Sequence, residues 1–138
     1  LQYSIENKSI GIREELWRKT YSIFKEYPIT GVGYSGFDVM FSRGTQYTSG
    51  HNIYLEFLAM GGIVGFMLFA YFLYLQAKDS WILFRKTGEY ISLNLLVVVM
   101  IEMSKSVGIQ QTNTMWLIFA VIISKVLYRR EEEYIAEQ

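Results

Sequence analysis

His51 is the side chain of this sequence best suited to acid–base chemistry. It is the single histidine of the chain, and a neutral imidazole can accept a proton from a sugar hydroxyl at the pH of an extracytoplasmic compartment. It lies just before a long apolar stretch, where a lipid-linked substrate would present its head group. From its position, His51 could be a structural histidine at a membrane interface or a catalytic base, and both interpretations stay open here.

Arg13 is a second candidate because of its place on a helix predicted over residues 11–27. At 100° per residue this helix has an apolar and a polar half, and Arg13 falls within the apolar one, between Thr20 and Phe24. A guanidinium held on the protein-facing side of the helix is suited to bidentate contact with phosphate. The alternative is an arginine of the first turn that extends its charge into water.

Polar residues beside the candidate base could orient a sugar or cap the helix that follows. Asn52 and Tyr54 are predicted to do one or the other, and Thr48 or Ser49 is the predicted N-cap of the helix that follows. Glu56, one turn after Asn52, is predicted to hold a polar group near the membrane interface.

Glycines mark two places where close backbone contact is expected. The run over residues 31–36 has the letters of a dinucleotide-binding fingerprint, but a helix and Pro28 precede it instead of a strand, and no βαβ unit surrounds it. Nucleotide binding is therefore rejected, and these glycines are expected to allow a tight turn and the close approach of a ligand or another segment. Gly61 and Gly65 have the spacing of a helix-packing pair.

The composition excludes several classes of function. The chain has no cysteine, so it has no thiolate nucleophile, and a single histidine cannot build a zinc site on imidazoles alone. The 13 basic and 13 acidic residues cancel, so no net charge draws the chain to nucleic acid. No metal, cofactor or nucleic-acid partner is expected.

The hydropathy pattern predicts an all-α, polytopic helical membrane protein with an extracytoplasmic loop that carries the amphipathic helix. Of the 138 residues, 51% are hydrophobic, and about 20 apolar residues suffice to cross a bilayer. The basic residues that follow the first and third spans place those sides in the cytoplasm. The expected segments are a loop at 1–52, spans at 53–75, 90–107 and 113–128, a cytoplasmic loop at 76–89, an outer turn at 108–112 and a cytoplasmic tail at 129–138. Because the chain opens on Leu1, we expect a fragment.

Taken in order, several motifs resemble the O-antigen ligase and polymerase family. They are Arg13 with Trp17, the sequence Tyr-Pro-Ile-Thr-Gly-Val-Gly at 27–33, His-Asn-Ile-Tyr-Leu at 51–55 and Gly-Gly-Ile-Val-Gly at 61–65. This order is similar to the family's signature, which runs from an arginine helix through a Pro-x-x-Gly-x-Gly turn to a His-Asn before a glycine-containing span. The resemblance covers about residues 12 to 75.

The resemblance implies a polytopic, GT-C-like glycosyltransferase that acts on undecaprenyl-pyrophosphate-linked glycans at the outer face of the bacterial inner membrane. It implies that Arg13 holds the pyrophosphate and that His51 is the base on the acceptor hydroxyl, with inversion and without a metal ion. Further family arginines lie upstream of this signature. The implied partners are the lipid-linked glycan, membrane lipid and a possible chain-length regulator.

Three functions stay open at this point. The first is a polymerase of oligosaccharide repeat units in polysaccharide biosynthesis at the cell envelope, which we favour. The second is a ligase that transfers the glycan to lipid A core or to protein. The third is a non-enzymatic transporter subunit, for which Glu102 and Lys105, near one end of the second predicted span, could form a polar pathway.

Overall fold

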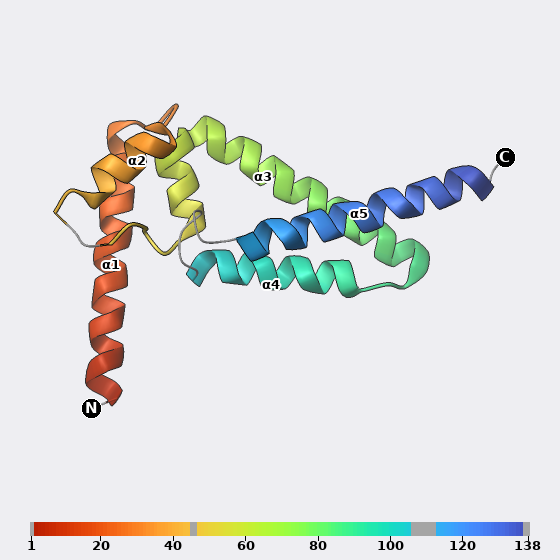
Figure 1. Cartoon of the computed structure of the whole chain (residues 1–138), viewed down its shortest axis with the longest axis horizontal. Helices are drawn as coiled ribbons and strands as arrows, with labels where there is room; N and C mark the ends of the chain where they lie inside the picture. The colour runs from red at the N-terminus through yellow and green to blue at the C-terminus, as the bar shows by residue number, and fades with distance from the viewer. Residues whose placement is uncertain (1, 45–46, 106–112, 137–138) are drawn as a thin grey trace. The chain divides into compact units, whose positions relative to one another are not determined.

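The computed structural model describes residues 2–44, 47–105 and 113–136, and every regular element in these ranges is an α-helix. The helices are α1 (Gln2–Glu26), α2 (Gly33–Ser42), α3 (Ile53–Thr87), α4 (Ile91–Lys105) and α5 (Asn113–Ala136), as Figure 1 shows. The predicted all-helical class is thus confirmed. The predicted outer turn at 108–112 lies outside the described residues.

The helices belong to two compact units. The first unit contains α1, α2, α3 as far as Phe69, and the last residues of α4 from Met103. The second contains the rest of α3 from Ala70, α4 as far as Glu102, and α5. The residues predicted to take part in catalysis or substrate binding, namely His51, Arg13, Asn52 and Tyr54, fall in the first unit, whereas Glu102 of the transporter alternative falls in the second.

Helix α1 begins earlier than predicted, at Gln2 instead of Gly11. A glycine inside a helix costs only about 1 kcal/mol relative to alanine, which is too little to end a helix by itself. Among the residues of α1 from Gly11 onward, Leu16, Thr20 and Ile23 are buried, and they repeat at helical spacing. The amphipathic character predicted for this segment therefore holds, with a buried stripe narrower than the predicted apolar half.

Helix α2 was not predicted, because the glycine run that begins it indicated only a turn. Gly33 has a φ of 72° and starts the helix in the left-handed region, which glycine enters at no steric cost. Phe37 and Phe41 of α2 are buried, and their rings stack at 5.1 Å. With Leu16 and Ile23 of α1 they form the core of the first unit.

Helix α3 is broken at Gly62, where φ is 60° and ψ is −162°, a conformation essentially restricted to glycine. An added Cβ on Gly62 would lie 2.3 Å from the carbonyl oxygen of Ile29. An added Cβ on Gly31 would lie 2.3 Å from the carbonyl oxygen of Met60. The loop after α1 and the break in α3 therefore cross in direct backbone contact, and both crossing points require glycine.

Hydrogen bonds hold this crossing together. The first two amides after the break, those of Ile63 and Val64, donate to the carbonyls of Pro28 and Ile29 at 2.8 and 3.2 Å. In return, the amide of Val32 donates at 3.1 Å to the carbonyl three residues before the break. Helix ends leave backbone groups without intrahelical partners, so the loop supplies partners to both ends that the break creates.

The break also allows the two parts of α3 to contact each other. The rings of Phe57, before the break, and Phe69, after it, stack at 3.9 Å, and Phe69 is buried. The close helix packing predicted at Gly61 and Gly65 is not found among the described residues. An added Cβ on Gly65 would meet nothing within 4 Å, so the glycine that makes the close contact is Gly62.

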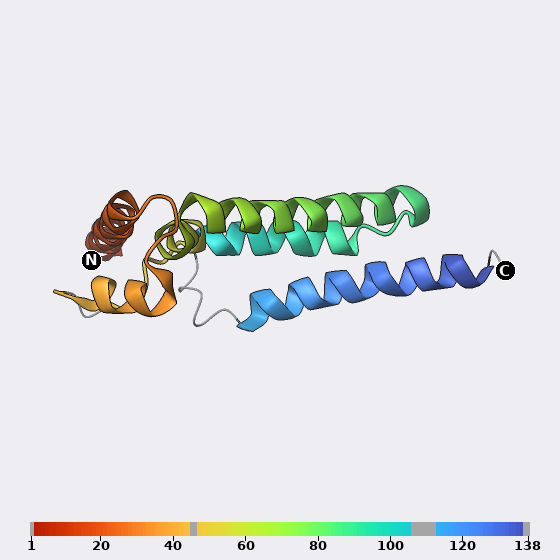
Figure 2. The same cartoon turned by 90° about the horizontal axis from the view of Figure 1, so that it is seen from above.

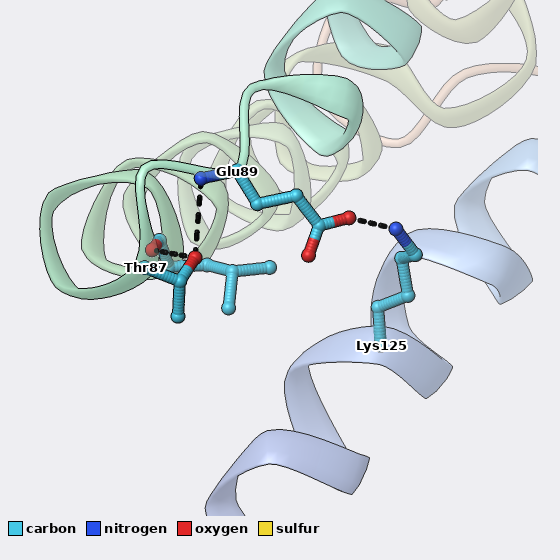
Figure 3. A network of polar contacts seen from close by, with 4 residues as sticks. Thr87, Glu89 and Lys125 are labelled. Atoms are coloured by element: carbon cyan, nitrogen blue, oxygen red, sulfur yellow. Dashed lines mark hydrogen bonds and ion pairs between the residues drawn. The ribbon is translucent and has the colours of Figure 1, made fainter.

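In the second unit, α3 and α4 run in opposite directions and are joined by a short turn at Gly88, which has a φ of 74° (Figure 2). The amide of Glu89 donates to the hydroxyl of Thr87 at 3.2 Å, and the carboxylate of Glu89 pairs with Lys125 of α5 (Figure 3). This ion pair connects the turn to α5. Its partner on α5, Lys125, lies within the third predicted span.

One helix of the described residues, α3, is long and apolar enough to cross a membrane. Only 17% of its most apolar window is buried, whereas a core helix of a soluble protein buries most of its surface. Helices α4 and α5 lie at the second and third predicted spans, and α5 continues beyond residue 128 to Ala136. The three-span topology stays a prediction.

Candidate functional site

The loop that leads into α3 is seated on α1 at Gly50. An added Cβ on Gly50 would lie 2.4 Å from Oγ1 of Thr20, so the loop backbone passes α1 with no room for a side chain. Thr20 is fully buried, and its hydroxyl donates to the carbonyl of Leu16 at 2.9 Å. The loop therefore has a fixed seat on one residue of α1.

Glu56 holds the same glycine from the other side. Its carboxylate oxygen Oε1 accepts a hydrogen bond from the amide of Gly50 at 2.8 Å, and the residue is only 1% exposed. Glutamate is almost never fully buried without a partner, and the first turn of a helix is a favourable place for a negative charge. The prediction that Glu56 holds a polar group is confirmed, and that group is the Gly50 amide.

His51 follows this anchored glycine and has a left-handed backbone, with a φ of 54°. Positive φ is uncommon for residues other than glycine and costs energy that the surrounding contacts must offset. The amide of His51 donates to Oγ of Ser49 at 3.1 Å, and its side chain is half-buried. The imidazole therefore projects from a backbone that its neighbours hold in an unusual conformation.

Asn52, on the other side of His51, is the N-cap of α3. Its side-chain Oδ1 accepts from the amide of Leu55 at 3.1 Å, the pattern typical of a cap. The prediction of Thr48 or Ser49 as the cap is wrong, because the helix begins at Ile53 and the cap is the residue directly before it. Of the two roles left open for Asn52, the structure shows capping.

Tyr54 lies in the first turn of α3 and is half-buried, with its ring 6.4 Å from that of Phe69. This contact joins the start of α3 to the part that follows the break at Gly62. The predicted roles of Asn52 and Tyr54 in orienting a substrate stay predictions.

Arg13 is exposed, which corrects the expectation that it lies on the protein-facing side of its helix. It has no ion pair with another described residue. Seven residues separate Arg13 from Thr20, which is nearly two full turns, so both lie on almost the same face about 10 Å apart along the axis. The loop covers this face at Thr20 and leaves Arg13 exposed farther along.

Arg13 and His51 both lie in the first unit, on segments that meet at Thr20 and Gly50. Thr20, which shares its helix face with Arg13, touches the glycine next to His51.

Sequence reasoning missed the contacts that seat the loop. Thr20 was assigned only to the apolar half of the helix, and Gly50 was not singled out. A glycine directly before the one histidine, with a carboxylate six residues after that glycine, was the available signal. The partner of that carboxylate could not be read from spacing because the hydrogen bond depends on the loop's three-dimensional path.

These features define a helical protein in which one helix of the described residues, α3, is long and apolar enough to cross a membrane. At the start of that helix, the loop that carries His51 contacts α1, the helix that carries Arg13. Residues 4–70 match the family described as O-antigen ligase. The resemblance found in the sequence is thereby confirmed over residues 4–70, which are similar to the O-antigen ligase family.

The matched range includes nearly all of α1, the whole of α2 and α3 through its break. The family implies a glycosyltransferase-type enzyme, and together with the apolar α3 it indicates a membrane protein. Neither the curated proteins nor the solved structures include a significant match to the chain.

Proposed function

We propose that the chain is part of a membrane glycosyltransferase that polymerises undecaprenyl-pyrophosphate-linked oligosaccharide repeat units into a surface polysaccharide, such as O-antigen, capsule or exopolysaccharide. The reaction takes place at the outer face of the bacterial inner membrane. The observation that carries the proposal is the anchored His51 loop, which lies within the range matched by the O-antigen ligase family. A base beside the N-terminal end of an apolar helix agrees with the glycosyl transfer that this family implies.

The proposed reaction is a single displacement. His51 takes the proton of the acceptor hydroxyl as the hydroxyl oxygen forms a bond to the anomeric carbon of the donor glycan. The bond from that carbon to the pyrophosphate oxygen breaks, and the undecaprenyl pyrophosphate leaves with the bonding electrons. Attack opposite to the leaving group inverts the anomeric centre, and no metal ion takes part.

Arg13 is proposed to hold the pyrophosphate. Its exposure and the lack of an ion pair with another described residue leave the guanidinium free to meet phosphate oxygens. Charge that develops on the leaving group is stabilised most by cations already in place before the reaction. The resemblance places further arginines upstream, and these would share the task. Asn52 and Tyr54 are proposed to orient the substrate beside the base.

The second candidate function is a ligase, which the description of the matching family favours. The displacement and its residues would be the same, and the acceptor would be lipid A core or a protein instead of another lipid-linked repeat. A chain-length regulator is a proposed partner of the polymerase only. The transporter alternative loses support, since the family implies an enzyme.

The test is the glycan profile of a strain that lacks the parent protein and is complemented with the wild type, His51→Ala or Thr48→Ala at equal membrane levels. Thr48 is an exposed residue of the same loop and serves as the matched control. For a polymerase we expect His51→Ala to accumulate single lipid-linked repeats, whereas Thr48→Ala keeps the wild-type profile. Long lipid-linked polymer that never reaches its acceptor would identify a ligase. A wild-type profile in His51→Ala would exclude His51 as the base.

A further inference from the structure

We propose that Glu56 is a positioning residue for His51, and that its buried carboxylate sets the backbone from which the imidazole reaches the acceptor hydroxyl. This inference rests on the proposed role of His51 as the base. It assigns to Glu56 a function in the reaction without contact to the substrate.

The geometry isolates His51 between two anchors. Before it, the amide of Gly50 donates to Oε1 of Glu56 at 2.8 Å. After it, the side chain of Asn52 caps α3 through the amide of Leu55 at 3.1 Å. Both anchors belong to the first turn of α3 or to its cap, so the start of one helix determines the backbone on each side of the histidine.

The backbone of His51 needs such anchors. Its φ of 54° is a conformation that persists only where surrounding contacts determine it. A hydrogen bond from a backbone amide to a carboxylate is charge-assisted and stronger than one to a neutral acceptor. Without it, the peptide before His51 would relax toward common backbone angles and move the imidazole away from the acceptor.

Glu56 itself is not suited to be the base. The residue is only 1% exposed, and one of its carboxylate oxygens is already bonded to Gly50. Thr20 completes the seat, because its hydroxyl lies where a side chain on Gly50 would have to be. The buried carboxylate therefore acts on the loop, and the half-buried imidazole acts on the substrate.

The experiment compares Glu56→Leu, which removes the acceptor, with Glu56→Gln, which keeps a side-chain oxygen. His51→Ala is the reference for loss of the base. Gln76→Leu is the matched control, since Gln76 is also a buried polar residue of α3 and its Oε1 has no hydrogen-bond partner among the described residues. Initial transfer rates are measured for the full parent protein in lipid nanodiscs, with lipid-linked repeat units purified from the deletion strain as donor.

We expect Glu56→Leu to lower kcat about a hundredfold, since a displacement of about 1 Å can have this effect. The KM for the donor should stay within about twofold, because the residues proposed to bind the pyrophosphate are unchanged. Glu56→Gln should retain kcat within about tenfold of the wild type, as a neutral acceptor replaces a charged one. Gln76→Leu should behave as the wild type.

The outcomes separate this inference from the proposed function. If His51→Ala is inactive while Glu56→Leu has the wild-type kcat, the positioning role is refuted and the base assignment stands. Equal losses in Glu56→Leu and Glu56→Gln, per amount of monodisperse protein, would also refute it. Activity in His51→Ala would overturn both. If Glu56→Leu fails to accumulate, Gly50→Ala tests the same seat with the carboxylate in place and should show the same selective loss of kcat.

Discussion

The crossing of the post-α1 loop with the break in α3 should be the most sensitive point of the first unit, and Gly62→Ala tests it. Gly62 has a φ of 60° and a ψ of −162°, and a Cβ there would lie 2.3 Å from the carbonyl oxygen of Ile29. Because the contact atom is backbone, a rotamer change cannot relieve the clash. The variant must therefore move one of the two segments.

The magnitude follows from two contributions. A residue other than glycine in this backbone region costs about 1 to 3 kcal/mol. Separation of the segments also removes the hydrogen bonds that Ile63 and Val64 donate to the loop, each with a net contribution of about 1 kcal/mol. The sum, about 3 to 5 kcal/mol, is a large part of the about 5 to 15 kcal/mol by which proteins are stable.

Two other glycines provide controls for the separate contributions. Gly33 has a φ of 72° but nothing within 4 Å of an added Cβ, so Gly33→Ala introduces backbone strain without a clash. Gly65 lies in the helix with nothing within 4 Å, so Gly65→Ala introduces neither and should add up to about 1 kcal/mol of helix propensity. The three variants differ from the wild type by the same single methyl group.

The assay is the thermal midpoint of each detergent-solubilised variant, followed by the fraction that stays monodisperse after heating. We expect Gly65→Ala to equal or exceed the wild type, Gly33→Ala to fall slightly, and Gly62→Ala to fall by on the order of 10 °C. Equal midpoints for Gly62→Ala and Gly65→Ala would refute the reasoning, because they would show that the backbone contact at the break has no energetic consequence.

Three smaller perturbations test other contacts. Gly50→Ala should lower the transfer rate because its Cβ would lie 2.4 Å from Oγ1 of Thr20, and adding Thr20→Ala should restore part of the rate; no recovery in the double variant would argue against this seat. Asn52→Ala should cost about 1 kcal/mol by loss of the cap, with Asn52→Ser less affected, and equal thermal midpoints for the two would contradict capping. Glu89 and Lys125 have side chains 23% and 36% exposed, so a double-mutant cycle on unfolding should give a coupling of about 1 kcal/mol or less; a coupling several times larger would show a pair less accessible to water.

The helical class and the resemblance to the family could be predicted because both depend on local signals. Apolar runs and helical periodicity reveal helices without knowledge of their neighbours, and the order and spacing of the motifs from Arg13 to Gly65 indicate the family. The apolar stretch at 53–75 is a helix, but its break at Gly62 was not foreseen. A glycine within an apolar run is equally compatible with close helix packing and with a break in the helix. Only the contact with the loop that follows α1 distinguishes these two alternatives.

The errors at Arg13 and at the cap of α3 have a similar cause. The helical wheel places Arg13 on the same face as Thr20, and this agrees with the structure, but exposure depends on which segment covers the face at each level. Ser49 is a suitable N-cap by residue type, and it instead accepts the amide of His51. Residue preferences identify the possible partners, whereas the path of the loop decides which of them is used.

The two contacts between α1 and α3 have a joint consequence for the proposed reaction. The Thr20–Gly50 seat fixes the start of α3 on α1, and the crossing at Gly62 fixes α3 a second time, through the loop that follows α1. Two separate points of attachment restrict rotation of the first part of α3 on α1 more than a single point would. About 10 Å along α1 separates the level of Arg13 from that of the loop seat. In the proposed displacement, pyrophosphate and acceptor hydroxyl lie on opposite sides of the anomeric carbon, so a cation and a base set apart in one compact unit fit that reaction better than two groups in direct contact.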